Sequence, residues 1–419
     1  MATASPMPPR AVAAPPASEA ATHDRMAWIG AWSANLFCLC IVLFLYARGL
    51  APSWEGLNTD FMLVGLVFLS IHAVYRVLTV PTWRGFDALS LTSIWLVFAG
   101  IVGALISTFG NRNFNLASLK DLGAVAFVCL APFVLLFADR IRIIAALGVL
   151  CVGFALLDAV LNILAYLDIY ELANYSNRID ELGLRVRYTG LTGNSHASGL
   201  VMFLAVMILC WGYKIKRLPL VICAAIVAFL FISGYLIDAR RYVVFSLIGV
   251  VLILRPMSVR FPPVLIAAVV AAIFIYATFT ASNLDYGNQL RASLMIAGWR
   301  DAMQHPILGA GMTYRDQTEL VPTFNSLVQA GVAESILIEF MRDFGIFFTA
   351  LWLAGILLAL SKPGVLQTLP GIILTLEVAE LTFGGVLRGP TGSFLFYACY
   401  CFLICDLVPP HRARAGPPD

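Results

Sequence analysis

The stretch ALSLTSIWLVFAGIVGALISTF, residues 88–109, carries no charged side chain and is long enough to cross a lipid bilayer as one helix. A membrane span needs about 20 mostly apolar residues, because the hydrocarbon layer is about 30 Å thick. The whole chain shares this bias, with 60% hydrophobic and 12% charged residues, far from the balance of a soluble globular domain. Residues 88–109 therefore predict one span of a membrane protein.

The rest of the chain repeats this pattern. The eighth apolar segment is short, and the tenth is long and interrupted. We predict an all-α, polytopic integral membrane protein with about 12 transmembrane helices. The segments are 27–47, 61–80, 88–109, 121–138, 141–167, 196–213, 218–237, 242–254, 263–281, 333–361, 368–387 and 391–408.

The ends of the chain differ from this membrane domain. Residues 1–25 are rich in Ala and Pro and lack the continuous apolar region of a cleaved signal peptide. We predict a disordered cytoplasmic tail at 1–25, a single membrane-embedded domain at 26–410, and a second cytoplasmic tail at 411–419.

Loop charges predict the orientation, because basic residues are enriched in cytoplasmic loops. Placing both termini in the cytoplasm gives every short inner loop at least one basic residue. The two long connections, about 168–195 and 282–332, then lie outside and are expected to carry short amphipathic helices. The inner basic residues are Arg76, Arg84, Arg140, Arg142, Lys214, Lys216, Arg217, Arg255, Arg260 and Lys362.

Arginine dominates the basic residues predicted for the outer face. An arginine fork binds two phosphate oxygens at once and stays protonated, whereas lysine offers a single point charge. Positive charge kept on the translocated side predicts a polyanionic ligand there, such as a lipid pyrophosphate. Lys120 is the single lysine predicted for this face. The twelve arginines are Arg48, Arg112, Arg178, Arg185, Arg187, Arg240, Arg241, Arg291, Arg300, Arg315, Arg342 and Arg388.

Several other classes of ligand are not indicated. All nine cysteines fall in predicted spans, where cysteine is usually an apolar filler, so neither a disulfide framework nor a metal site is expected. A net charge of +3 is too small to suggest nucleic acid. No glycine-rich phosphate loop followed by lysine is present, and we expect no cofactor.

The first long loop ends in SNRIDELGLRVRYTGLTGNSHASG, residues 176–199. One interpretation is a solvated connector. The other is a binding segment in which Arg185 and Arg187 share an extended face, while Asn194 and His196 supply neutral hydrogen bonds. His196 could equally be a helix cap or an interfacial contact rather than a base.

A very tight outer turn follows between two apolar segments. It contains Asp238, Arg240 and Arg241. The arginines could reach the lipid headgroups and pair with Asp238. We favour a role in binding, because Gly, Asn or Ser would form this turn without placing positive charge on the translocated side.

These segments together resemble the bacterial O-antigen ligase and polymerase superfamily. The resemblance rests on Arg187-Tyr-Thr-Gly190, Asn194, the turn at Arg240, and GWRDAMQHPILGAGM at residues 298–312. It spans roughly 185–350. It implies an inner-membrane glycosyltransferase that takes a glycan from undecaprenyl pyrophosphate at the periplasmic face without a metal. Arg240 and Arg300 would then be catalytic, and Arg185, Arg187, Arg241, Asn194, His196, Trp299 and Arg342 would bind substrate.

One position departs from the family pattern. Ligases of this family usually carry a histidine where this chain has Glu334, and Gly345 follows after ten intervening residues. A carboxylate can accept a proton from the acceptor hydroxyl, orient the acceptor, or simply favour a helix N-terminus. The substitution favours a polymerase over an O-antigen ligase acting on lipid A-core.

The other charges in predicted spans are expected to face the interior of the bundle, since charge is costly in hydrocarbon. Glu339 and Arg342 are expected to form an ion pair. Glu377 and Glu380 could pair with Arg342 or Arg388, and Asp158 has no partner nearby in sequence.

A transporter or flippase is the rival class, but no internal repeat is present and the charges gather at one face.

Overall fold

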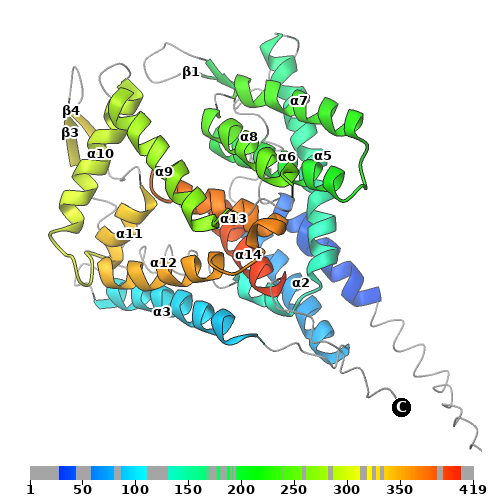
Figure 1. The fold of residues 1–419 in the computed structure, drawn as a ribbon, viewed down its shortest axis with the longest axis horizontal. Helices are drawn as coiled ribbons and strands as arrows, with labels where there is room; N and C mark the ends of the chain where they lie inside the picture. The colour runs from blue at the N-terminus through cyan, green and yellow to red at the C-terminus, as the bar shows by residue number, and fades with distance from the viewer. Residues whose placement is uncertain are drawn as a thin grey trace, which may run out of the picture.

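The computed structural model is mainly helical (Figure 1). It describes residues 28–43, 58–79, 86–110, 131–167, 169, 177–179, 186–188, 191, 195–237, 239–256, 261–281, 286–311, 319–322, 327–330, 335–384 and 390–406. The two predicted tails lie outside these residues. The helices are Trp28–Leu43, α2 (Asn58–Thr79), α3 (Ala88–Gly110), η2 (Ala131–Phe137), α5 (Arg140–Tyr166), α6 (Ser195–Lys214), α7 (Leu220–Leu236), α8 (Arg240–Leu254), α9 (Pro263–Thr280), α10 (Tyr286–Ala302), α11 (Ile336–Phe344), α12 (Ile346–Leu360), η6 (Val365–Gln367), α13 (Leu369–Glu380) and α14 (Pro390–Asp406).

Four of these helices are long and apolar enough to cross a membrane, which supports a membrane-associated protein. They include Ala88–Thr108, the stretch from which the prediction began. Five further apolar helices in the described part of the chain are shorter. The number of crossings and the orientation stay predictions, and the fourth predicted segment is described only as the 3₁₀ helix η2.

The interrupted tenth segment is two helices that meet at Gly345. This residue ends α11 and begins α12 with φ 84° and ψ 160°. That backbone conformation is open essentially to glycine alone. Gly345 therefore allows the chain to turn sharply between the two helices.

The two long loops contain short antiparallel hairpins. In the first, β1 (Asn177–Ile179) pairs with β2 (Val186–Tyr188), where short helices were expected. In the second, α10 is followed by β3 (Glu319–Pro322) paired with β4 (Leu327–Ala330). Val-Arg-Tyr alternates apolar and polar residues, and Val, Tyr and the Ile of Asn-Arg-Ile favour strands, which explains the difference in the first loop.

Helices α3 and α12 lie side by side along the lower edge of the molecule in Figure 1, and small residues allow their close approach. A Cβ at Gly100 would lie 2.4 Å from the Cβ of Trp352, and one at Gly355 would lie 2.8 Å from the carbonyl oxygen of Ser93. Glycine at helix contacts is typical of membrane bundles, where close packing replaces the hydrophobic driving force.

Buried hydroxyl groups join this pair to α14. Ser93 donates to the carbonyl of Gly355 at 2.7 Å and lies 2.7 Å from the hydroxyl of Tyr400. The indole of Trp352 donates to the hydroxyl of Tyr397 at 2.7 Å. Polar groups between apolar helices must be satisfied within the protein, so these bonds fix the mutual positions of the three helices.

An ion pair joins the residue just before α3 to a residue just after the end of α12. The ammonium of Lys362 lies 2.8 Å from Oδ1 and 3.0 Å from Oδ2 of Asp87, and it also donates to the hydroxyl of Ser90. Partial burial acts to raise the pKa of Asp87, but the hydrogen bonds from Lys362 and Ser90 outweigh it and lower that pKa below 3.8.

We predict that Asp87→Asn lowers the free energy of unfolding by about 1–3 kcal/mol, because it leaves a buried ammonium without its counter-ion. Lys362→Met should cost less, since it removes the buried charge as well. Thermal unfolding of the purified protein measures both. An equal loss in the two variants would contradict the argument.

The contribution of this pair should also depend on pH. Because the folded state depresses the pKa of Asp87 below 3.8, the stabilisation is complete above that pH and is lost as the pH falls through the folded-state value. The difference between wild type and Asp87→Asn should therefore shrink at low pH.

Candidate functional site

The structure describes only part of the predicted site. Arg185, Asn194 and Glu334 lie outside the described residues. Arg187 belongs to β2 and His196 to α6, but only their backbones are described. The convergence of Arg187, Arg240 and Arg300 on one ligand therefore stays a prediction.

The first long loop is held by Asp158, which lies in the apolar helix α5 and is 4% exposed. Its Oδ1 accepts the backbone N–H of Leu191 at 2.5 Å, and the amide of Asn162 donates to Oδ2 at 3.4 Å. It also bonds to the side chain of Ser198. Asp158 thus fixes the chain just after Arg187-Tyr-Thr-Gly190 and just before the body of α6.

The end of GWRDAMQHPILGAGM docks on the junction between α11 and α12. The backbone N–H groups of Ala310 and Gly311 each donate at 2.8 Å, to the carbonyls of Arg342 and Asp343. The N–H of Ile346 donates to the carbonyl of Pro306 at 2.7 Å. This set of contacts, the loop–helix junction, joins the segment at 306–311 to the end of α11 and the start of α12.

Glycine is required on both sides of the loop–helix junction. Gly309 has φ +72°, and a Cβ there would lie 2.4 Å from the carbonyl carbon of Asp343. At Gly345 a Cβ would lie 2.1 Å from the carbonyl oxygen of Ile307. The obstacles are backbone atoms, which cannot rotate away, so both positions exclude a side chain.

Arg342 lies beneath this junction and is 4% exposed. Its Nε donates to Oδ1 of Asp343 at 2.9 Å, and the carboxyl group of Asp343 is fully buried. Glu339 and Asp301 also interact with it electrostatically. The expected pair with Glu339 is therefore part of a larger network, and the burial of Arg342 favours holding α10 against α11 over the predicted contact with substrate.

A second buried ion pair lies at the beginning of α8. Nη1 of Arg241 is 3.0 Å from Oε1 of Glu380, the last residue of α13. The hydroxyl of Tyr242 donates to the same oxygen at 3.3 Å. The partner of Glu380 is thus Arg241, and not Arg342 as the sequence had suggested.

The C-terminal turn of α13 also receives the N-terminus of α11. The N–H groups of Ile336 and Leu337 donate to the carbonyls of Gly384 and Leu381, at 3.3 and 3.0 Å. Ser335 caps the N–H of Ile338 and donates to the carbonyl of Leu381 at 3.2 Å. These N–H groups of α11 are already bonded within the protein, so they are not available to bind a phosphate.

These contacts bring the residue after Glu334 close to the pair formed by Arg241 and Glu380. Ser335 and Arg241 both contact the C-terminal end of α13, although 94 positions separate them in the sequence. We refer to Arg241, Ser335, Glu380 and Gly384 as the α13 junction.

The predicted catalytic arginines remain accessible. Arg240 begins α8 and Arg300 lies in the last turn of α10, and both are exposed. Trp299 is 49% exposed beside Arg300. An exposed guanidinium can meet a ligand that approaches from outside the bundle, as the sequence prediction requires.

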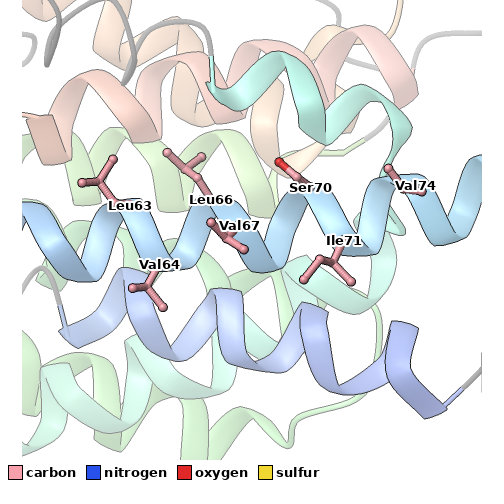
Figure 2. A pocket seen from close by; sticks show the side chains of 7 residues that line it. All are labelled: Leu63, Val64, Leu66, Val67, Ser70, Ile71 and Val74. Atoms are coloured by element: carbon pink, nitrogen blue, oxygen red, sulfur yellow. The ribbon is translucent and has the colours of Figure 1, made fainter.

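A separate apolar groove of about 680 Å³ lies along α2 (Figure 2). Ser70 is its only polar lining side chain, and the other lining residues are aliphatic. Nothing in this groove could recognise an anion. The lining residues are Leu63, Val64, Leu66, Val67, Ser70, Ile71 and Val74.

No family model, no curated protein and no solved structure matches this chain. Within the described residues, no three side chains of His, Cys, Asp or Glu lie close enough together to hold a metal ion. The class that the structure supports is a helical, membrane-associated protein with buried ion pairs at helix ends.

We predict that Gly309→Ala and Gly345→Ala each destabilise the loop–helix junction by at least about 1–2 kcal/mol, the cost of a left-handed backbone for a residue with a Cβ. The clash with backbone atoms adds to this cost. Thermal unfolding and limited proteolysis between α10 and α12 would measure it.

Gly153→Ala is the matched control, because a Cβ at this helical position meets nothing within 4 Å. It should be neutral or slightly stabilising, as alanine favours a helix. The docking described here is wrong if all three variants unfold alike.

Proposed function

We propose that this chain is a membrane glycosyltransferase. It would move a glycan from undecaprenyl pyrophosphate to an acceptor sugar hydroxyl at the periplasmic face of the bacterial inner membrane. The proposed form of this activity is an O-antigen or exopolysaccharide polymerase.

The observation that carries the proposal is the contact between the two motif segments. The sequence resemblance places importance on the Gly-x-Gly segment at 309–311 and on Gly345, which are far apart in the chain. In the fold these glycines pack on each other's backbone neighbours at the loop–helix junction. Each segment requires glycine where it meets the backbone of the other, which supports a common role for the two segments.

The chemistry suits the outer arginines. Breaking the bond between a sugar and a pyrophosphate develops negative charge on the departing phosphate, and preplaced guanidinium groups stabilise that charge. Arg240 and Arg300 would perform this role, with Arg185, Arg187 and Arg241 holding the pyrophosphate. Asn194, His196 and Trp299 would contact the glycan.

Glu334 would contact the acceptor hydroxyl, either as a base or by orienting it. Its neighbour Ser335 is fixed on the C-terminal turn of α13, close to Arg241. This proximity supports a proposal in which the acceptor contact lies beside the phosphate contact. A transfer reaction requires that arrangement, because the acceptor must attack the carbon that the phosphate leaves.

We predict that Arg240→Ala and Arg300→Ala each reduce glycan transfer by about 10²–10³-fold, the usual loss when one contact to a transition-state anion is removed. Arg187→Ala should behave alike. The assay uses purified protein in detergent with a lipid-pyrophosphate glycan.

Arg291→Ala is the control, since Arg291 is exposed on the same helix as Arg300 and bonds to Asn288 at 3.4 Å. It should retain activity. Full activity of the three Arg→Lys variants would refute the argument from bidentate binding.

Glu334→Gln distinguishes the two roles of this residue. A base requires the carboxylate, so the variant should lose most turnover while donor binding persists. An orienting role would tolerate glutamine, because its amide oxygen still accepts a hydrogen bond. Donor binding and chain extension, measured side by side, decide between them.

Two alternatives have distinct outcomes. A ligase would transfer the glycan to lipid A-core. Offering the purified protein both lipid A-core and an acceptor glycan distinguishes a ligase from a polymerase.

A transporter or flippase is favoured by Glu377, whose carboxylate oxygens are buried without a hydrogen-bond partner in the described residues. Such buried acids often mark ion pathways. Glycan transfer in detergent, where no membrane separates two compartments, would exclude transport as the activity.

A further inference from the structure

A group of polar side chains lies inside the bundle where helices α5, α6 and α7 contact one another. Its acidic member is Asp158, and its neutral members are Asn162, Ser198 and Ser233. Each of the four residues is 4% exposed or less. Nδ2 of Asn162 lies 3.4 Å from Oδ2 of Asp158 and 3.4 Å from the hydroxyl oxygen of Ser233. We refer to these four residues as the Asp158 cluster.

A glycine beside each serine allows the helices to approach closely at the cluster. Gly234 follows Ser233 on α7, and a Cβ there would lie 2.4 Å from the sulfur of Met202 on α6. Gly199 likewise follows Ser198 on α6, and a Cβ there would lie 2.5 Å from an aromatic ring of α8. The two hydroxyl groups are therefore enclosed by packed helices and shielded from solvent.

The carboxylate of Asp158 meets only neutral groups in the described part of the chain. Its hydrogen-bond donors are the N–H of Leu191, the amide of Asn162 and the hydroxyl of Ser198. Neutral donors stabilise a negative charge without cancelling it. A carboxylate among apolar helices is costly unless a cation accompanies it. The cluster therefore lacks one positive charge.

The amide of Asn162 carries an unmatched oxygen at the same place. Its Oδ1 is buried and has no hydrogen-bond partner in the described part of the chain, whereas its Nδ2 faces two acceptors. Rotating the amide by half a turn would direct Oδ1 at Asp158 and Ser233. Carboxylate and amide oxygens are both acceptors, so they repel each other unless a cation lies between them. A bound cation would satisfy the unmatched oxygen and the uncompensated carboxylate together.

The donor atoms indicate which kind of cation would fit. The cluster offers five oxygen atoms, two from Asp158 and one each from Asn162, Ser198 and Ser233. Oxygen ligands favour hard cations over the softer transition metals. A single carboxylate balances a single positive charge, so a divalent ion would leave an excess charge inside the bundle. These constraints favour a monovalent ion.

We propose that the Asp158 cluster is a binding site for a sodium ion, and that the bound ion fixes the first long loop to the bundle. The connection to the loop is the N–H of Leu191, which donates to Oδ1 of Asp158. Because the ion and this N–H share one carboxylate, binding of the ion stabilises the docked position of Leu191. The site is buried and separate from the outer arginines, so the proposal does not depend on glycan transfer.

Equilibrium binding of radioactive sodium to the purified full chain in detergent tests the proposal, with choline chloride keeping the ionic strength constant. Wild type should bind one ion per chain. Asp158→Asn should weaken binding by more than about a hundredfold, because losing even an outer partner of a metal site costs about 10–100-fold. Glu377→Gln is the matched control, since it removes another buried carboxylate, on α13. It should bind sodium as wild type does.

The folded state provides two further readouts. Sodium at about ten times its dissociation constant should raise the unfolding temperature of wild type by about 2–4 °C, and should not raise that of Asp158→Asn. It should also slow hydrogen exchange at the N–H of Leu191. Asn162→Asp adds a second carboxylate one turn along α5, so calcium should stabilise this variant and not wild type.

Three results would overturn the proposal. The first is no sodium binding by wild type, or undiminished binding by Asp158→Asn. The second is loss of sodium binding in Glu377→Gln, which would assign the ion to α13. The third is an unfolding temperature that follows the pH but not the sodium concentration, which would assign the cluster to a proton. If Asp158→Asn fails to fold, sodium binding by wild type and the response of Asn162→Asp to calcium still decide.

Discussion

A polar group inside a bundle of apolar helices must find its partner within the protein, because no water is present to replace it. Among the residues that the structure describes, three buried or half-buried charged groups join segments that are distant in sequence. Glu380 joins α13 to α8, Asp158 joins α5 to the chain before α6, and Lys362 joins the end of α12 to the beginning of α3. The apolar helices could slide against one another, and these contacts prevent it.

Backbone contacts complete the arrangement at the second long loop. The loop–helix junction uses carbonyls and N–H groups on both sides, and it depends on two glycines that accept unusual backbone angles. The N-terminus of α11 is likewise bonded to the C-terminal turn of α13. The N–H groups at the start of α11 are therefore satisfied within the protein.

The arginines divide into two groups by environment. Arg342 is buried in a network of acidic groups, where it links α10 and α11. Arg240 and Arg300 are exposed, and Arg241 lies between these extremes. A buried arginine surrounded by carboxylates is neutralised by the protein itself, whereas an exposed one remains in contact with its surroundings. Burial thus separates structural arginines from candidate ligand-binding ones better than sequence position does.

The sequence by itself indicated the helical, membrane-associated character of the chain, because uncharged apolar stretches such as 88–109 have the length and composition of membrane spans. It also indicated the break in the tenth segment, which is long and interrupted. Local composition carries such information, since helix length and backbone freedom depend on neighbouring residues.

Only the tertiary structure decided which charges pair. The spacing of Glu377 and Glu380 suggested Arg342 or Arg388, but Glu380 pairs with Arg241, 139 positions away. The first long loop forms a hairpin where helices were expected. Asp158, for which the sequence suggested no partner nearby, accepts hydrogen bonds from Asn162 four residues on and from Leu191. Ion pairs and loop anchors depend on how helices pack against each other, and that packing is not encoded in the spacing of residues along any one helix.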